Sequence, residues 1–312
     1  MTLQQLRYLC EVARRNLSVS DAATALHTSQ PGISKQILAL EDELGVQVFV
    51  RRGKRLTEMT PAGKRLVAMA ETVLANAGNL KRAARDLQDE SVGEMVIATT
   101  HTQARYLLPK VIPIFLKRFP KVSLFIHQGN PMQVAAEVAS GRADIGIATE
   151  YLDGVAELVT MPLYAWNRVV VAQKGHPILS KRKLTLADIA AYPLVSYDIS
   201  MTGRGAVNRA FVEQGITPNF VISAMDADVI KTYVELGIGI GLLAEMAYNV
   251  KQDGALGVIS AKHLFAESVT KLALKRGAFL RGYTYELIEL LAPKLTREAV
   301  DGVLSASGVL IQ

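Results

Sequence analysis

The stretch that most constrains the fold runs from Ser18 to Leu44 and contains two helical patterns separated by a tight break at 27–29. The first pattern, which Ser18 or Ser20 is placed to cap, has apolar residues at helical spacing: Val19, Ala22, Ala23 and Leu26. The second has Pro31 in its first turn and one apolar stripe: Ile33, Ile37, Leu40 and Leu44. Two short amphipathic helices joined by a tight break predict a helix–turn–helix.

The face opposite the second stripe is short and polar, and its N-terminal end carries no acid. The residues we expect to meet DNA from this helix are Ser29, Gln30, Pro31, Ser34, Lys35 and Gln36. A helix that enters the DNA major groove needs such a face. The spacing alone fits equally well an ordinary helical hairpin whose polar face meets only water, because helix–turn–helix patterns are common false positives.

The next segment favours DNA binding over that alternative. Residues 46–50 alternate as a strand does, residues 51–55 form a turn, and Leu56-Thr57 resume the strand. The hairpin has four cations at its tip and no acid between Gly45 and Thr57; the cations are Arg51, Arg52, Lys54 and Arg55. Cations there suit phosphate contacts. We therefore predict a winged helix–turn–helix domain over residues 1–59.

A long helix is expected next, with Thr60 as its cap and Pro61 at its first position. Its apolar stripe covers more than six turns, which a small DNA-binding unit cannot bury completely: Leu66, Ala70, Val73, Leu74, Ala77 and Leu80. Residues 60–90 are thus predicted to be a dimerisation helix with a linker, and packing within one chain is the alternative.

Beyond a polar break at 88–93, strands and helices alternate, as they do in an α/β sheet. The expected strands are 94–99, 122–128, 143–148, 169–172, 194–196, 220–222, 238–243 and 269–274; the main helices are 104–119, 131–140, 202–214 and 228–236, with final helices near 279 and 297. Crossings at 161–167 and 264–268 predict two lobes in the effector domain 91–312. Lobe I is about 91–162 and 268–312, lobe II about 163–267, and a small ligand would bind between them.

Hydroxyl-rich points occur where strands end or helices begin: Thr99 to Gln103, Thr149, and Ser200 to Gly203. Ligands bind at the carboxyl ends of strands in open α/β sheets, and helix N-termini favour anions. Any one of these threonines is explained as well by helix capping. Three such points together predict a small polar or anionic ligand.

Composition narrows the function further. The chain of 312 residues is half hydrophobic, with 35 basic and 29 acidic residues, so its net charge of +6 supports DNA binding only because the wing concentrates it. The single Cys10 indicates a reducing compartment, and with no signal peptide or membrane span we expect a cytoplasmic protein. The five histidines are scattered, so we expect no metal site, no cofactor and no enzyme activity.

The N-terminal part resembles the LysR-type transcriptional regulators through Leu6-Arg7-Tyr8, Ala22-Ala23, Ser29-Gln30-Pro31, Ser34-Lys35-Gln36 and Thr60-Pro61-Ala62-Gly63. Within that family the whole chain is most similar to the CysB-like branch, which includes Cbl. The sharpest matches are residues 28–36, 98–106, 226–233, Trp166-Asn167-Arg168 and Thr202-Gly203-Arg204.

The resemblance implies a homotetramer that binds promoter DNA, works with RNA polymerase and activates sulfur-assimilation and cysteine-biosynthesis genes. The implied effector is N-acetylserine or O-acetylserine, with sulfate or thiosulfate in the same cleft. By motif match the ligand-binding residues are Thr100, Thr102, Gln103, Thr149, Trp166 and Thr202. Asp198 lies in a segment, 197–201, whose sequence differs from the one usual in CysB-like proteins. A Cbl-like regulator of sulfonate or sulfate-ester use, responding to sulfate or its adenylylated form, therefore stays open.

Two other classes of protein share some of these features. A solute-binding protein has a two-lobed cleft but would lack residues 1–90 and carry a signal peptide. An enzyme would need a nucleophile or an acid–base pair in the cleft, and the sequence offers none.

Overall fold

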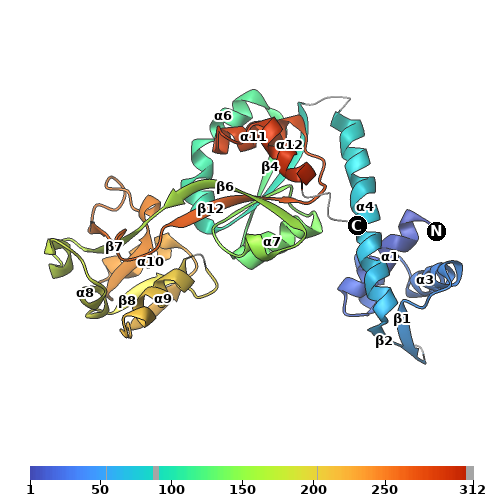
Figure 1. Cartoon of the computed structure of the whole chain (residues 1–312), viewed down its shortest axis with the longest axis horizontal. Helices are drawn as coiled ribbons and strands as arrows, with labels where there is room; N and C mark the ends of the chain where they lie inside the picture. The colour runs from blue at the N-terminus through green and yellow to red at the C-terminus, as the bar shows by residue number, and fades with distance from the viewer. Residues whose placement is uncertain (54, 87–90, 202, 307–312) are drawn as a thin grey trace. The chain divides into compact units, whose positions relative to one another are not determined.

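We describe a computed structural model of the chain, which covers residues 1–53, 55–86, 91–201 and 203–306. The chain divides into two compact units, Met1–Leu87 and Gln88–Gln312. Figure 1 shows that the first unit is mostly helical and that the second is a two-lobed α/β domain.

The first unit is a winged helix–turn–helix followed by a long helix. Its elements are α1 (Leu3–Arg14), α2 (Val19–Ala25), α3 (Gln30–Leu44), β1 (Phe49–Arg52), β2 (Arg55–Met59) and α4 (Pro61–Asp86). Side-chain oxygens cap the first three helices: Thr2 accepts from Gln5, Ser18 from Asp21 and Ser29 from Gly32. Gly45 ends α3 in the left-handed conformation, with φ of 65°, which a glycine adopts without strain. The predicted helices and hairpin are confirmed.

The core of this unit joins α1, α3 and the wing. Leu9, Val12, Ile33, Ile37, Leu40 and Phe49 are all at most 1% exposed. They sit at the spacing of one helical face in α1 and in α3, so that burying them fixes which side of α3 stays in solvent.

Helix α4 has the length predicted for a dimerisation helix. Val67 and Ala70 are buried and Leu66 and Leu74 pack beside them on the N-terminal core. Met69, Val73 and Leu80 are exposed, at 64%, 42% and 73%. An apolar side that no described residue of this unit covers supports dimerisation through α4, which stays a prediction. Residues 87–90 of the expected linker lie outside the described residues.

Lobe I, as the structure has it, is built on the sheet β4-β3-β5-β12-β6. Its elements are β3 (Val92–Thr99), α5 (His101–Tyr106), η1 (Leu108–Lys110), α6 (Ile112–Arg118), β4 (Lys121–Gln128), α7 (Pro131–Ser140), β5 (Ile145–Ala148), η2 (Leu152–Gly154), β6 (Leu158–Trp166), β12 (Ser268–Lys275), α11 (Gly282–Leu291) and α12 (Arg297–Ala306). Alternate residues of β12 face opposite cores: Leu272 and Leu274 pack with α6 and α11, whereas Ala273 packs with α7.

Lobe II is built on the sheet β11-β7-β10-β8-β9. Its elements are β7 (Arg168–Gln173), η3 (Pro177–Ser180), α8 (Leu186–Ala190), β8 (Leu194–Tyr197), α9 (Arg204–Glu213), β9 (Phe220–Ala224), α10 (Ala227–Glu235), β10 (Ile240–Ala244), η4 (Glu245–Ala247) and β11 (Leu256–Ser260). Strand β10 is buried along its whole length, and it pairs parallel with β8 and antiparallel with β7.

Three glycines at 237, 239 and 241 lead the chain from α10 into β10. Gly237 has φ of 78° just after the helix. A Cβ on Gly239 would lie 2.2 Å from the carbonyl oxygen of Pro193, and one on Gly241 would lie 2.6 Å from the side chain of Val171. These glycines let the chain turn sharply and pack closely on β7 and on Pro193 just before β8.

Three predictions about the second unit were wrong in detail. The helix expected at 104–119 is three pieces, because Pro109 and Pro113 interrupt the helical bonding. Most of the segment expected as a crossing at 161–167 belongs to the nine-residue strand β6, which ends at Trp166 and pairs antiparallel with β12 (Figure 1). Strand β11 was missed. The chain passes between the lobes at Asn167 and again between Ser260 and Ser268.

Candidate functional site

The first candidate site is the exposed face of α3. Ser29, Gln30, Pro31, Lys35 and Gln36 are exposed and Ser34 is half-buried. The hydroxyl of Ser29 accepts the backbone N–H of Gly32 at 3.3 Å, so it also caps the helix. Because Ile33 and Ile37 are buried on the opposite side, the predicted DNA-contacting residues share one solvent-facing surface.

The wing carries the predicted cations in two different settings. Arg52 and Arg55 are exposed and make no ion pair with any described residue. Arg51 is half-buried, and its Nη1 lies 2.7 Å from the carboxylate of Glu41 in α3. Lys54, also predicted to contact DNA, lies outside the described residues. No local sequence pattern predicts this ion pair, because Glu41 lies ten residues before Arg51 in another element.

The second candidate site is a pocket between the two lobes of the second unit. Its lining consists of Thr100, Thr102, Gln103 and Trp166 from lobe I and Tyr197, Met201, Met225 and Ala244 from lobe II. None of these described lining side chains is charged. Four of the six predicted ligand residues therefore meet in one pocket.

A hydrogen-bond network behind the lining centres on Thr270 of β12. Its Oγ1 accepts from the indole Nε1 of Trp166 at 3.1 Å and shares a hydrogen bond with Thr149 at 3.1 Å. Gln103 donates to the same oxygen at 3.4 Å and accepts from the hydroxyl of Tyr164. Thr149 thus holds Trp166 rather than lining the pocket, and Thr202, the sixth predicted residue, lies outside the described residues.

Sequence reasoning missed Thr270, Tyr164, Tyr197, Met201 and Met225. Tyr197 ends strand β8, so the strand-end rule that selected Thr149 applies to it as well. Thr270 lies in the middle of β12, where nothing in the sequence separates it from an ordinary strand threonine.

Two buried cations lie close to the pocket in lobe II. Arg168 is 3% exposed; it donates to the carbonyls of Ala266 and Gly203 and to the hydroxyl of Ser268, and its guanidinium lies 5.1 Å from the ring of Trp166. Burial lowers the pKa of Arg168 from its usual value, although it stays charged at neutral pH. Among the described residues it makes no ion pair.

Arg204 is the second buried cation. It donates to the carbonyl of Tyr197 and to the side chain of Asn208. Asp198, which left the ligand class open at the sequence level, does not line the pocket. Its carboxylate accepts the backbone N–H and the hydroxyl of Ser200, at 2.9 and 2.7 Å, and these bonds lower the pKa of Asp198.

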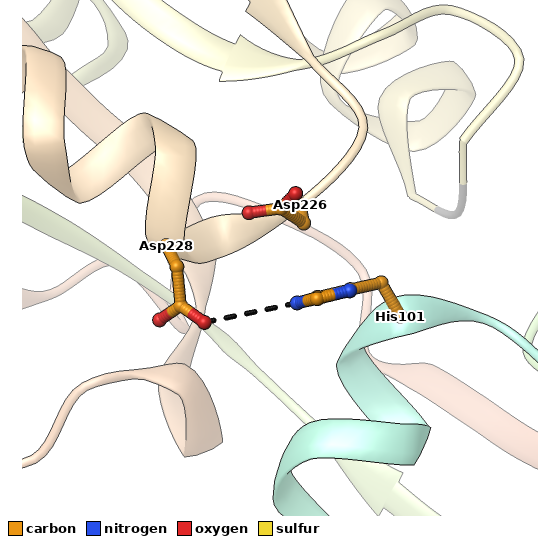
Figure 2. Close-up of side chains that lie close together, drawn as sticks. All are labelled: His101, Asp226 and Asp228. Atoms are coloured by element: carbon orange, nitrogen blue, oxygen red, sulfur yellow. Dashed lines mark ion pairs between the residues drawn. The ribbon is translucent and has the colours of Figure 1, made fainter. Parts of the chain in front are cut away.

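One further group of side chains joins the lobes beside the pocket. Figure 2 shows His101 pointing from α5 toward Asp228 at the start of α10, with Asp226 nearby. Ligand atoms of the three residues lie within 4.8 Å of one another, the spacing of a metal site. The carboxylate of Asp228 is already paired with Arg105 and Lys231, at 3.4 and 3.1 Å. A dication would need this carboxylate as a ligand and would be repelled by the two positive charges beside it. The set does not fit a metal ion.

No helix among the described residues is both long enough and apolar enough to cross a membrane.

A winged helix–turn–helix joined to a two-lobed domain with an interlobe pocket defines a ligand-responsive DNA-binding regulator. Residues 3–64 match the family model "Bacterial regulatory helix-turn-helix protein, lysR family", and residues 88–296 match "LysR substrate binding domain". The chain belongs to the LysR family of transcriptional regulators, and the predicted family, fold class and absence of an enzymatic role are confirmed by this match and by the relatives below.

The chain is similar, along nearly its whole length, to proteins that are named as transcriptional regulators. The chain is 50% identical to the transcriptional regulator SsuR of Burkholderia cenocepacia, covering 97% of this chain and 99% of SsuR. It is 47% identical to CysB of the same organism, covering 97% of each chain. It is 43% identical to the regulator Cbl of Escherichia coli, covering 96% of this chain and 95% of Cbl.

Solved structures show the same fold. The cofactor-binding domain of the Cbl transcriptional regulator superposes with a TM-score of 0.66 at 41% identity, covering 68% of this chain and 93% of that domain. A full-length OxyR from Pseudomonas aeruginosa gives a TM-score of 0.65 at 25% identity, covering 95% of this chain and 98% of OxyR.

Proposed function

We propose that this LysR-type regulator controls genes of sulfur assimilation and cysteine biosynthesis, mainly as an activator, in response to a small anionic effector held in the interlobe pocket. The observation that supports an anionic effector is the chemistry of the pocket lining. Thr100, Thr102 and Gln103 offer hydroxyl and amide groups, and no described residue of the lining brings a carboxylate that would repel an anion.

The charge near the pocket supports the same class of ligand. The guanidinium of Arg168 lies behind Trp166 and against Gly203, where it bonds only to neutral oxygens. A buried cation that makes no ion pair with a described residue leaves a positive field in a region of low dielectric, and an anion in the pocket would be stabilised by it, although the carboxylate of Glu150 acts on Arg168 in the opposite sense. The hydroxyls then supply hydrogen bonds without a full countercharge.

The effector that fits this proposal is N-acetylserine or O-acetylserine, with sulfate or thiosulfate competing for the same groups. All carry a negatively charged group and hydrogen-bond acceptors on a small body; O-acetylserine also carries an ammonium group, so N-acetylserine, sulfate and thiosulfate are the net anions among them. Promoter DNA is the proposed target of α3 and the wing, and a homotetramer that contacts RNA polymerase is the proposed working assembly. LysR-type regulators are generally oligomeric, and the exposed apolar side of α4 supports self-association.

A second candidate is a regulator of sulfonate or sulfate-ester use that responds to sulfate or its adenylylated form. The 50% identity to SsuR and the match to the Cbl domain favour it as much as the identity to CysB favours the first. Asp198 does not decide between the two, because its carboxylate is bonded to Ser200 instead of facing the pocket.

The test is a titration of the full chain with each compound. Binding is measured by calorimetry and by the fluorescence of Trp166, the single tryptophan, which lies in the pocket. Acetylserine binding, with sulfate or thiosulfate as competitor, supports the first candidate. Silence with acetylserine and binding of sulfate or adenylyl sulfate supports the second.

Thr100→Val removes a 4% exposed hydroxyl while keeping the shape of the side chain. It should weaken effector binding at least tenfold and leave DNA binding intact. Thr284→Val is the matched control, since Thr284 is an equally buried threonine on α11, far along the chain from the pocket lining. Equal affinity in the two variants would remove Thr100 from the site, and no binding of any compound by the unchanged protein would overturn the proposed effector class.

A further inference from the structure

Helix α5 of lobe I carries two different sets of side chains. Thr102 and Gln103 line the pocket, whereas His101, Arg105 and Tyr106 turn toward lobe II. One six-residue helix thus holds both the pocket lining and the contacts that cross the cleft.

The lobe II partner of all three crossing side chains is one carboxylate, that of Asp228 in the first turn of α10. The hydroxyl of Tyr106 donates to Oδ1 at 2.7 Å. Arg105 Nε lies 3.4 Å and His101 Nε2 lies 3.7 Å from Oδ2 (Figure 2).

The carboxylate is itself held in place within lobe II. Lys231, one turn along α10 and 6% exposed, lies 3.1 Å from Asp228 and 2.9 Å from the buried Asp253. It also donates to the carbonyl of Ala247 and to the hydroxyl of Tyr106. Partial burial opposes the ionised form of Asp228, but the bonds from Tyr106 and Lys231 outweigh it and lower the pKa of that carboxyl.

We propose that Asp228 is a positioning residue for effector binding: it fastens α5 to lobe II and so sets where Thr102 and Gln103 stand across the pocket. We call the contacts of Asp228 with His101, Arg105 and Tyr106 the interlobe clasp. The inference rests on the proposed effector site. The clasp favours the lobe arrangement in which the pocket has walls from both lobes, and the apparent affinity for a ligand is proportional to the fraction of molecules that hold that arrangement.

Asp226 provides a matched control two residues away. Its Oδ1 caps α10 by accepting the N–H of Val229 at 2.8 Å, and no hydrogen bond or ion pair joins it to a described residue of lobe I. Asparagine caps helices about as well as aspartate, so Asp226→Asn removes a charge at the same place while the helix start is kept.

The first experiment needs no ligand. Hydrogen exchange of the full-length Asp228→Asn variant should be at least severalfold faster than that of the unchanged protein at the α5 amides, 101–107. It should be unchanged in Asp226→Asn. Faster exchange in both variants, or in neither, would overturn the clasp whatever the effector is.

The second experiment tests the link to binding. With the effector that binds the unchanged protein, Asp228→Asn should weaken affinity about tenfold, and Tyr106→Phe, which removes only the hydroxyl, about threefold. The double variant should lose less than the product of the two single losses, because both changes weaken the bond between Tyr106 and Asp228, whereas only Tyr106→Phe also removes the bond from Lys231. Losses that multiply would show independent, merely structural effects and overturn the positioning role.

Two further outcomes separate this inference from the rest. If no compound binds the unchanged protein while exchange still follows the expected pattern, the proposed function fails and the clasp stands as a device for some other ligand. If Zn²⁺ raises effector affinity and a chelator lowers it in the unchanged protein but not in Asp226→Asn, the cluster is a metal site and the clasp is wrong.

Discussion

The carboxylate of Glu41 in the recognition helix α3 lies 2.7 Å from the guanidinium of Arg51 in the wing. The other oxygen of the same carboxylate accepts the backbone N–H groups of Val48 and Phe49, at 2.7 and 3.1 Å. Glu41 is 5% exposed, so this one acid fixes the wing strand on the end of the helix and holds one wing cation beside it. The two elements predicted to contact DNA are thereby tied together.

The two neighbouring arginines of the wing should therefore behave differently. Arg52→Ala should weaken binding to all DNA and reduce the salt slope of log affinity by about 0.9, the value for one phosphate contact, with no change in stability. Arg51→Ala should also weaken DNA binding, but it should lower the free energy of unfolding by about 1 kcal/mol, because Glu41 then lacks its counter-ion.

The measurements for this pair are DNA affinity on random sequence at several salt concentrations and urea unfolding followed by circular dichroism. Arg142→Gln, which removes an exposed cation of the other unit, is the control for net charge. An unchanged affinity and salt slope in Arg52→Ala would show that the wing does not contact phosphates.

Recognition-helix changes should affect sequence reading more than overall attraction to DNA. Gln30 and Ser34 carry no charge and lie on the face of α3 opposite the buried Ile33 and Ile37. Gln30→Ala or Ser34→Ala should cost about 1–3 kcal/mol on a specific operator and little on random DNA, with the salt slope unchanged. A competition assay between the two DNAs measures the ratio. Equal losses on both DNAs would contradict base reading by these residues.

The sequence predicted best those parts of the fold whose residues interact with near neighbours along the chain. The cap at Ser18, the apolar stripe of α3 and the helix at 131–140 depend on spacing within one element, and the structure has them. The contacts that assemble the pocket are of another kind. Thr270 reaches Thr149 across 121 positions and Trp166 across 104, and no local pattern specifies such pairs.

The wrong expectations have local causes that compete with periodicity. The segment 104–119 has helical spacing throughout, but Pro109 and Pro113 cannot donate the bonds that would continue one helix. In β6, Pro162 and the mixed pattern of buried and exposed residues hide a strand that exists because β12 pairs with it. Pairing with a distant strand overrode the weak local preference.

The buried cation behind the pocket leads to a prediction about ligand charge. Arg168→Met keeps an apolar chain of similar length and removes the charge. If Arg168 stabilises an anion in the pocket, affinity should fall more for a dianion such as sulfate than for a monoanion such as N-acetylserine. N-acetylserinamide, in which the carboxylate is replaced by a neutral carboxamide, should bind the variant as well as it binds the unchanged protein. Calorimetry on the full chain gives the three ratios.

Two variants control for structural damage at this position. Arg168→Lys keeps the charge but not the forked contacts with Ala266, Gly203 and Ser268, so it should restore most of the charge dependence. Arg142→Gln again removes a distant exposed cation. A loss of the same size for all three ligands in Arg168→Met would mean that Arg168 shapes the pocket without acting on the ligand's charge.

The last prediction concerns Cys10, which is 1% exposed on α1. Burial, assisted by Glu71, raises the pKa of its thiol from 9.0 to about 11. A raised pKa in the folded state means that the unfolded state loses the proton first, so the thiol stabilises the fold fully below pH 9 and this contribution disappears as pH rises through 11. In Cys10→Ala, the free energy of unfolding should therefore fall less between pH 8.5 and about 10.5 than in the unchanged protein, by about 1–2 kcal/mol.

Urea unfolding at both pH values measures that difference, and the rate of thiol alkylation gives an independent check. At pH 8 the native chain should react with iodoacetamide far more slowly than the urea-unfolded chain, because the thiolate is rare and the sulfur is covered. Rapid alkylation of the native protein would show that α1 opens readily from α4, whose Val67 carbonyl lies 3.9 Å from the sulfur. The packing of α1 on α4 would then be too loose to position the helix–turn–helix for DNA.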